Sequence, residues 1–94
     1  MSLIFEWDES KNRLNITKHG IDFVDVGRMF DLPLLTCGDD TDIHGELRWK
    51  AIGWLETVLC LVVFSEPMEG RVRIISARKA TKREAMQYGE IIKY

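Results

Sequence analysis

Cysteine, proline and long apolar segments are all scarce in this 94-residue sequence, which has two cysteines and two prolines. The longest uninterrupted apolar segment, residues 58–64, is far shorter than the ~20 residues that span a bilayer, so no membrane helix is expected. Cys37 and Cys60 form no C-x-x-C pair and lie beside or within apolar segments, which favours buried thiols over a disulfide or a metal site. The first residues lack the basic and apolar segments of a signal peptide, so we expect a cytoplasmic protein.

The composition is that of an ordinary globular protein. Hydrophobic residues make up 46% of the chain and charged residues 30%, a balance that excludes disorder and collagen-like repeats. The length fits one domain that spans residues 1–94.

Charge is segregated along the chain, although the formal net charge is only −2. Residues 1–47 carry four basic and ten acidic side chains, whereas residues 48–94 carry nine basic and five acidic ones. Between Arg71 and Arg83 there are six basic residues and no acidic one. Such a segment can hold phosphate groups, although most charge runs are simply solvated faces.

Two helices are predicted near the amino terminus, after a short strand at residues 3–7. Asp8 is suited to cap the first helix, which runs through Lys18 and ends at Gly20, where glycine accepts the left-handed conformation. Asp22 caps the second helix. Its apolar residues recur with helical spacing, so we predict an amphipathic helix that buries one face. These residues are Phe23, Val26, Gly27 and Phe30.

The pattern then changes to strands, which we predict at residues 34–37, 47–55, 58–65 and 71–77, with an acidic loop at 38–45. The all-apolar segment 58–64 is typical of a central strand that is buried on both faces. Short connectors favour antiparallel neighbours. Thr81 and Glu84 form a capping box at the start of a final helix. The predicted fold is α+β, a mostly antiparallel sheet packed by two N-terminal helices and one C-terminal helix.

No cofactor and no metal site are expected. The acidic loop begins like a calcium-binding loop at Asp40, but the twelfth position is Ala51, where a bidentate glutamate is required. The histidines and cysteines lack the spacing of zinc ligands. A phosphate-binding glycine loop and a nucleophile elbow are both missing, so nucleotide or ester hydrolysis has no support.

The remaining polar residues include potential bases, acids and phosphate clamps. RNA is cleaved without a metal when its 2′-hydroxyl attacks the adjacent phosphate, which requires a base, cations and an acid for the leaving oxygen. Arginine suits the clamp because its planar fork meets two phosphate oxygens and stays protonated. The candidates are Lys18, His19, Glu46, Arg48, Arg73, Ser76 and Arg78.

Each candidate has a structural alternative. His19 is placed to cap the end of a helix, and Glu46 is placed to form a salt bridge with Arg48. Arg78 is equally suited to pair with a carboxylate that ties the sheet to a helix. Tyr88 and the three tryptophans are expected to pack in the core.

Strand alternation restricts which arginines can act together. If Val72 and Ile74 face the core, Arg73 faces the other side and Arg78 falls on the core side. Arg73 and Arg78 therefore share one groove only if a bulge intervenes or Arg78 lies beyond the last pairing.

Three separated motifs occur in order along the chain. They are Phe5-Glu6-Trp7-Asp8 with Lys18-His19-Gly20-Ile21, then Asp42-x-His44-Gly45-Glu46-x-Arg48, then Val72-Arg73-Ile74-Ile75-Ser76-Ala77-Arg78. Together they resemble the BrnT toxin family, and the resemblance spans nearly the whole chain, from Phe5 to Tyr88. The resemblance implies a RelE-like fold and a ribonuclease toxin of a type II toxin–antitoxin pair, which cleaves RNA and so inhibits translation and growth.

The resemblance also implies partners and a site. The expected partners are RNA and a BrnA-like ribbon-helix-helix antitoxin, which alone contacts operator DNA; no membrane partner is implied. Carried over by motif, the catalytic residues are Lys18, His19, Glu46, Arg48 and Arg78. The substrate-binding residues are Arg73, Ser76, Lys79 and Lys82. As our hypothesis, Arg48 and Arg78 clamp phosphate, Glu46 or His19 is the base, and Lys18 is an electrostatic aid.

Two other classes of function remain open. The acidic first half of the chain, with Asp39, Asp40 and Asp42, is a possible docking face of a non-catalytic module that binds a basic partner protein. Direct DNA binding is disfavoured because the last helix has Lys82 and Arg83 only in its first turn.

Overall fold

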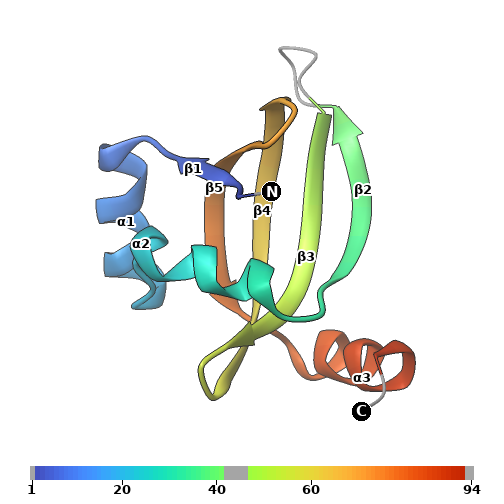
Figure 1. The fold of residues 1–94 in the computed structure, drawn as a ribbon. Helices are drawn as coiled ribbons and strands as arrows, with labels where there is room; N and C mark the ends of the chain where they lie inside the picture. The colour runs from blue at the N-terminus through green and yellow to red at the C-terminus, as the bar shows by residue number, and fades with distance from the viewer. Residues whose placement is uncertain (1, 42–46, 93–94) are drawn as a thin grey trace.

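The computed structural model describes residues 2–41 and 47–92. In these residues five strands form a sheet of order β1-β5-β4-β3-β2, accompanied by three α-helices (Figure 1). The elements are β1 (Ile4–Glu6), α1 (Glu9–His19), α2 (Phe23–Val26), the 3-10 helix η1 (Gly27–Asp31), β2 (Leu35–Thr41), β3 (Leu47–Leu55), β4 (Val58–Met68), β5 (Arg71–Lys79) and α3 (Lys82–Ile91). β1 runs parallel to β5, and every other neighbouring pair is antiparallel. The prediction of an α+β fold with a mostly antiparallel sheet is confirmed.

The ends of α1 and the start of α3 follow the local sequence signals. The carboxylate of Asp8 accepts hydrogen bonds from the backbone N–H groups of Ser10 and Lys11, and Gly20 ends α1 with φ of 71°. At α3, Thr81 and Glu84 form the predicted capping box, in which each side chain accepts from the backbone N–H of the other.

The second predicted helix is wound differently from the prediction. The prediction of an amphipathic α-helix through Phe30 is wrong, since α2 ends at Val26 and the 3-10 helix η1 continues the segment. The fully buried side chains are Phe23, Val26 and Met29, a spacing of three that matches the three residues per turn of a 3-10 helix. Met29 is therefore fully buried, whereas Phe30 is only half-buried.

Three strands are longer than predicted. β2 runs through Thr41 into the segment expected to be a loop, because it stays paired with β3. β4 extends to Met68 and β5 extends to Lys79. The two strands form a hairpin, and Gly70 has a positive φ of 80° at its turn. Residues 42–46, the rest of the expected acidic loop, lie outside the described residues.

β4 lies in the middle of the sheet, as its apolar sequence predicts. One face of the sheet, the core face, packs against the helical segment that crosses it in Figure 1. Its buried residues include Cys60, Val62 and Phe64 of β4. The opposite face carries Ile52 and Leu61, which pack beneath Tyr88 of α3.

Core packing of the large aromatic residues is also confirmed. Trp7 and Trp49 pack against the cluster on the core face, and Trp54 meets Tyr88 edge to face with ring centroids 6.4 Å apart. The hydroxyl of Tyr88 donates a hydrogen bond to the backbone carbonyl of Pro33, at 2.9 Å. This bond holds α3 to the segment that precedes β2.

The two cysteines differ. Cys60 is buried, and burial raises the pKa of its thiol. The prediction of a buried thiol is wrong for Cys37, which is exposed because β2 is the edge strand of the sheet. Among the described residues, no helix is long and apolar enough to cross a membrane.

Candidate functional site

A bulge in β5 decides which side chains share a face. Val63 of β4 pairs with Ser76 and Phe64 pairs with Ile74, so Ile75 is the extra residue of β5. After this residue the alternation is reversed. Arg73, Ser76 and Arg78 therefore all project from the face opposite the core. The sequence analysis required a bulge for Arg73 and Arg78 to share one groove, and the structure has this bulge.

The strand registers arrange polar residues of this face in rows that cross β3, β4 and β5. The three rows are Arg48–Ser65–Arg73, Lys50–Val63–Ser76 and Ile52–Leu61–Arg78. We call the surface formed by Arg48, Lys50, Arg73 and Arg78 the cationic face. Neighbouring strands lie ~4.8 Å apart, so the backbones of Arg48 and Arg73 are about 10 Å apart. Two arginine side chains at this separation can reach one phosphate group between them.

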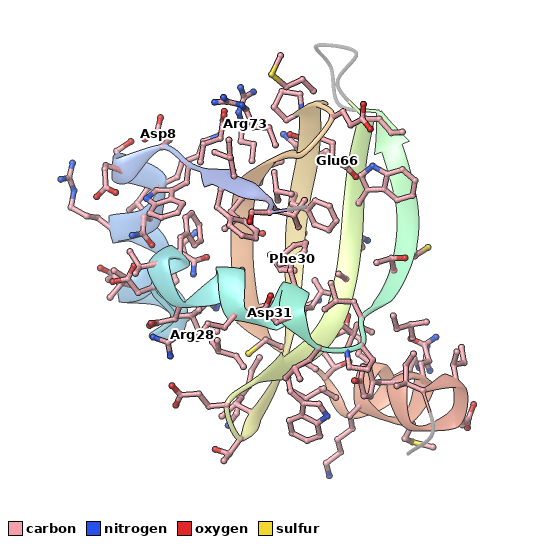
Figure 2. All side chains as sticks on the ribbon, viewed as in Figure 1. Asp8, Arg28, Phe30, Asp31, Glu66 and Arg73 are labelled. Carbon is pink, nitrogen blue, oxygen red and sulfur yellow. The ribbon has the colours of Figure 1, made fainter. Side chains whose placement is uncertain are left out.

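Arg73 is held by a carboxylate of the adjacent strand. Nε of Arg73 donates to Oε2 of Glu6 at 2.9 Å, and Nη1 of Arg71 donates to Oε1 at 3.1 Å. The hydrogen bond from Arg73, followed by that from Arg71, lowers the pKa of Glu6 from its ordinary value. Figure 2 shows Arg73 close to the place where β1 joins the sheet. The parallel strand thus fixes one end of the first row.

Arg78 forms the most extensive ion pair that we find among the described residues. Its Nη1 and Nη2 donate to Oε1 and Oε2 of Glu84, each at 2.9 Å, and Nη1 also donates to the carbonyl of Lys79 at 3.1 Å. The structural alternative for Arg78 is therefore realised, because the pair ties β5 to α3. The side chain of Arg78 nonetheless remains 38% exposed.

The same pair makes Glu84 a poor base. The hydrogen bond from Arg78 is the largest cause that lowers the pKa of Glu84 to about 2. A carboxylate with so low a pKa is ionised at neutral pH and takes up a proton weakly. Glu84 is therefore an ionised carboxylate with a structural role, and it is not a candidate for the general base.

Replacing Glu84 with glutamine is expected to lower the free energy of unfolding near neutral pH by about 1–2 kcal/mol. The folded-state pKa of about 2 lies below the ordinary value of 4.5. The stabilisation is thus complete above pH 4.5 and disappears as the pH falls through 2. Urea unfolding of both proteins along this pH range measures the difference. A gap between them that is the same at every pH would contradict the pairing, and Glu90→Gln on the exposed side of α3 is the control.

Lys18 and His19 meet Ser76 at the edge of β5. The three residues line a hollow of about 180 Å³ between α1 and β5, together with Ile75 and Asn15. Lys18 and His19 are exposed in the last turn of α1. Because Ser76 belongs to the second row, the end of α1 adjoins the cationic face.

Two predicted substrate-binding residues lie elsewhere. Lys79 pairs with Cys60, a residue of the core face, so its side chain projects from that face and lines a hollow with His19. Lys82 is exposed in the first turn of α3. Glu46 lies outside the described residues, as do the acidic residue Asp42 and the side chains of Asp39 and Asp40.

Lys50 is a member of the cationic face that the sequence analysis missed. It follows Arg48 by two residues, and side chains two apart in a strand share a face. Alternation from Arg48 is the signal that identifies it. Within the described ranges, no group of His, Cys, Asp and Glu side chains is arranged to hold a metal ion.

Two comparisons with known proteins identify the same family. Residues 7–84 match the sequence model of a family described as the ribonuclease toxin, BrnT, of type II toxin–antitoxin systems. The 1.1 Å crystal structure of the Brucella abortus ribonuclease toxin BrnT is similar to this fold with a TM-score of 0.70 and 32% sequence identity. The similarity covers 87% of this chain and 99% of that chain. A search of curated proteins gave no match.

Proposed function

This chain belongs to the BrnT family of ribonuclease toxins of type II toxin–antitoxin systems, and from that premise we propose that its cationic face binds the RNA backbone and promotes cleavage without a metal. The observation that carries the proposal is the bulge at Ile75. It puts Arg73 and Arg78 on the same face as Arg48 and Lys50. Four cations on one face of a sheet suit a polyanion, although the net charge of the chain is −2.

In this proposal the first row holds the phosphate that is cut. Arg48 and Arg73 approach it from two sides, and Lys50 of the second row adds a third cation. The base takes the proton of the 2′-hydroxyl as its oxygen attacks phosphorus, and the acid donates a proton to the 5′-oxygen as its bond to phosphorus breaks. The products are a 2′,3′-cyclic phosphate and a 5′-hydroxyl. Negative charge grows on the phosphate oxygens in the transition state, where fixed guanidinium groups stabilise it most.

The proton transfers need a base and an acid. His19 is the candidate for base among the described residues, because it shares a hollow with Ser76 of the second row. Glu46 remains the alternative from the sequence. Lys18 adds positive charge beside His19 and Ser76 is a hydrogen-bonding group for the RNA. Arg78 contacts the adjacent phosphate through the part of its side chain that Glu84 leaves exposed, and Lys82 contacts flanking nucleotides from the first turn of α3. Lys79 projects from the core face and has no role in this arrangement.

The family also bears on partners and location. A ribonuclease toxin of a type II toxin–antitoxin system implies an antitoxin partner and an RNA substrate. We propose further that the antitoxin is a ribbon-helix-helix protein that binds operator DNA, and that the toxin acts in the cytoplasm to inhibit translation. In the same proposal residues 1–94 form one domain with a RelE-like arrangement.

Removal of metal ions is expected to leave cleavage unchanged, within about twofold, because the charge stabilisation comes from guanidinium groups. The measurement uses the purified full chain and a single-stranded RNA with an excess of chelator. The same RNA with 2′-O-methyl groups should resist cleavage, because the attacking oxygen has no proton to lose. Activity that disappears with chelator and returns with magnesium would contradict the proposed chemistry, as would cleavage of the methylated RNA.

A further inference from the structure

A hollow of about 370 Å³ lies between α3 and the sheet, and we call it the α3 hollow. Leu35, Ile52 and Leu61 line its apolar side, and Gln87 and Ile91 line it from α3. Lys50 and Glu84 lie at its polar side. A volume of this size falls within the range of about 300–1,000 Å³ that small-molecule sites occupy.

We propose that the α3 hollow binds the nucleobase of the nucleotide that adjoins the phosphate on the cationic face. The inference rests on the proposed function and extends it to base recognition. Lys50 carries the connection, because it belongs to the second row of the cationic face and also lines the hollow. The third row, Ile52 and Leu61, is the next step along the same strands. The cationic face and the α3 hollow therefore adjoin each other, so one nucleotide can place its phosphate on the first and its base in the second.

The chemistry of the lining suits a base. A nucleobase has apolar faces and an edge of hydrogen-bond donors and acceptors, and proteins read single-stranded RNA through both. Ile52 and Leu61 offer the apolar contact, while the amide of Gln87 offers donors and an acceptor. Glu84 adds a carboxylate whose charge is balanced by Arg78 at 2.9 Å. The ion pair thus places an acceptor beside RNA with little net repulsion.

A larger groove on the other side of α3 suits this role less well. Its volume is about 920 Å³, and Trp54, Tyr88 and Ile92 line it. None of Arg48, Lys50, Arg73 and Arg78 is among its lining residues. A base in that groove would have no contact with the cations that hold the phosphate.

Cys37 provides a direct readout of occupancy. Its exposed thiol lines the α3 hollow, whereas Cys60 is buried and its pKa is raised, so iodoacetamide should alkylate Cys37 first. We compare the rate of alkylation of the full chain with a 2′-O-methyl RNA oligonucleotide and with an abasic oligonucleotide of the same backbone. Each oligonucleotide is added at a concentration of about ten times its dissociation constant. The 2′-O-methyl RNA should then slow alkylation about tenfold, because only unbound protein reacts. The abasic control should change the rate less than about twofold.

Two results would overturn the inference while the proposed function stands. Equal protection by both oligonucleotides would show that the backbone covers Cys37, and no protection by bound RNA would assign the hollow to another occupant. Binding is followed in parallel by fluorescence anisotropy. If neither oligonucleotide binds, the proposed function fails, and the inference fails with it.

A matched pair of variants tests base reading by activity. Gln87→Leu keeps the size of the side chain but removes its hydrogen-bonding groups, so the nucleotide preference next to the cut should relax by about fivefold or more. The readout is the sequence of product ends from a randomised RNA. Met86→Leu, at the neighbouring residue that is 65% exposed, should change neither quantity. An unchanged preference in Gln87→Leu would contradict the inference.

Discussion

Replacing Arg48 with alanine is expected to lower the rate of RNA cleavage about 100- to 1000-fold, the range typical for loss of one fixed donor to a transition-state anion. Arg48 begins the first row of the cationic face and lies across Ser65 from Arg73. In the variant, Arg73 contacts the phosphate from one side and no arginine contacts it from the other. The measurement is the single-turnover rate at saturating enzyme, with the melting temperature recorded for both proteins.

Arg28→Ala is the matched control for this variant, because it removes the same charge. Arg28 lies in η1, which crosses the core face (Figure 2). Its side chain is 65% exposed, and its ion pairs with Asp25 and Glu56 lie at the surface. Cleavage by Arg28→Ala should stay within about twofold of the parent. Equal losses in both variants would mean that total charge, and not the cationic face, controls the reaction.

Replacing Asn15 with alanine is expected to lower the free energy of unfolding by about 3 kcal/mol, because it leaves buried backbone groups without partners. The amide of Asn15 donates to the carbonyls of Ile21 and Ala77, each at 2.9 Å, and accepts from the N–H of Ala77 at 3.1 Å. β1 pairs with β5 only as far as Arg73. Asn15 therefore completes the edge of β5 where β1 has ended, as another strand would.

For a chain of this length the loss corresponds to a fall of about 12–24 °C in the melting temperature. Thermal and urea unfolding measure it. Thr17→Ala on the same helix removes an exposed bond to the carbonyl of Arg13 and should change stability by less than about 0.5 kcal/mol. If Asn15→Ala costs no more than Thr17→Ala, the edge of β5 does not depend on this amide.

The parts of the fold that the sequence predicts are those with local causes. Asp8, Gly20 and Thr81 act through hydrogen bonds or backbone angles within a few residues, and each lies where its helix starts or ends. The winding of η1 and the length of β2 depend on partners far along the chain. Gly27 lies against the ring of Phe5, where an added Cβ would be 3.2 Å from a ring carbon. Helical spacing along the sequence does not predict this contact between Gly27 and Phe5.

The candidate site divides in the same way. Alternation along β5 shows that Arg73 and Arg78 need a bulge to share a face, but the position of the bulge follows from the pairing of β4 with β5. The capping box identifies Glu84 as a helix-start residue. Its second role, the pair with Arg78, depends on how α3 packs against the sheet.

The most direct test of the central claim is an amide chemical-shift titration of the isotope-labelled full chain with 2′-O-methyl RNA. The account predicts that the largest shift changes fall on β3, β4 and β5 around the first two rows, at residues such as Lys50, Ser65 and Ser76. Arg28 and the rest of η1 should change little. Large changes confined to α2 and η1, with the three strands unaffected, would contradict an RNA site on the cationic face.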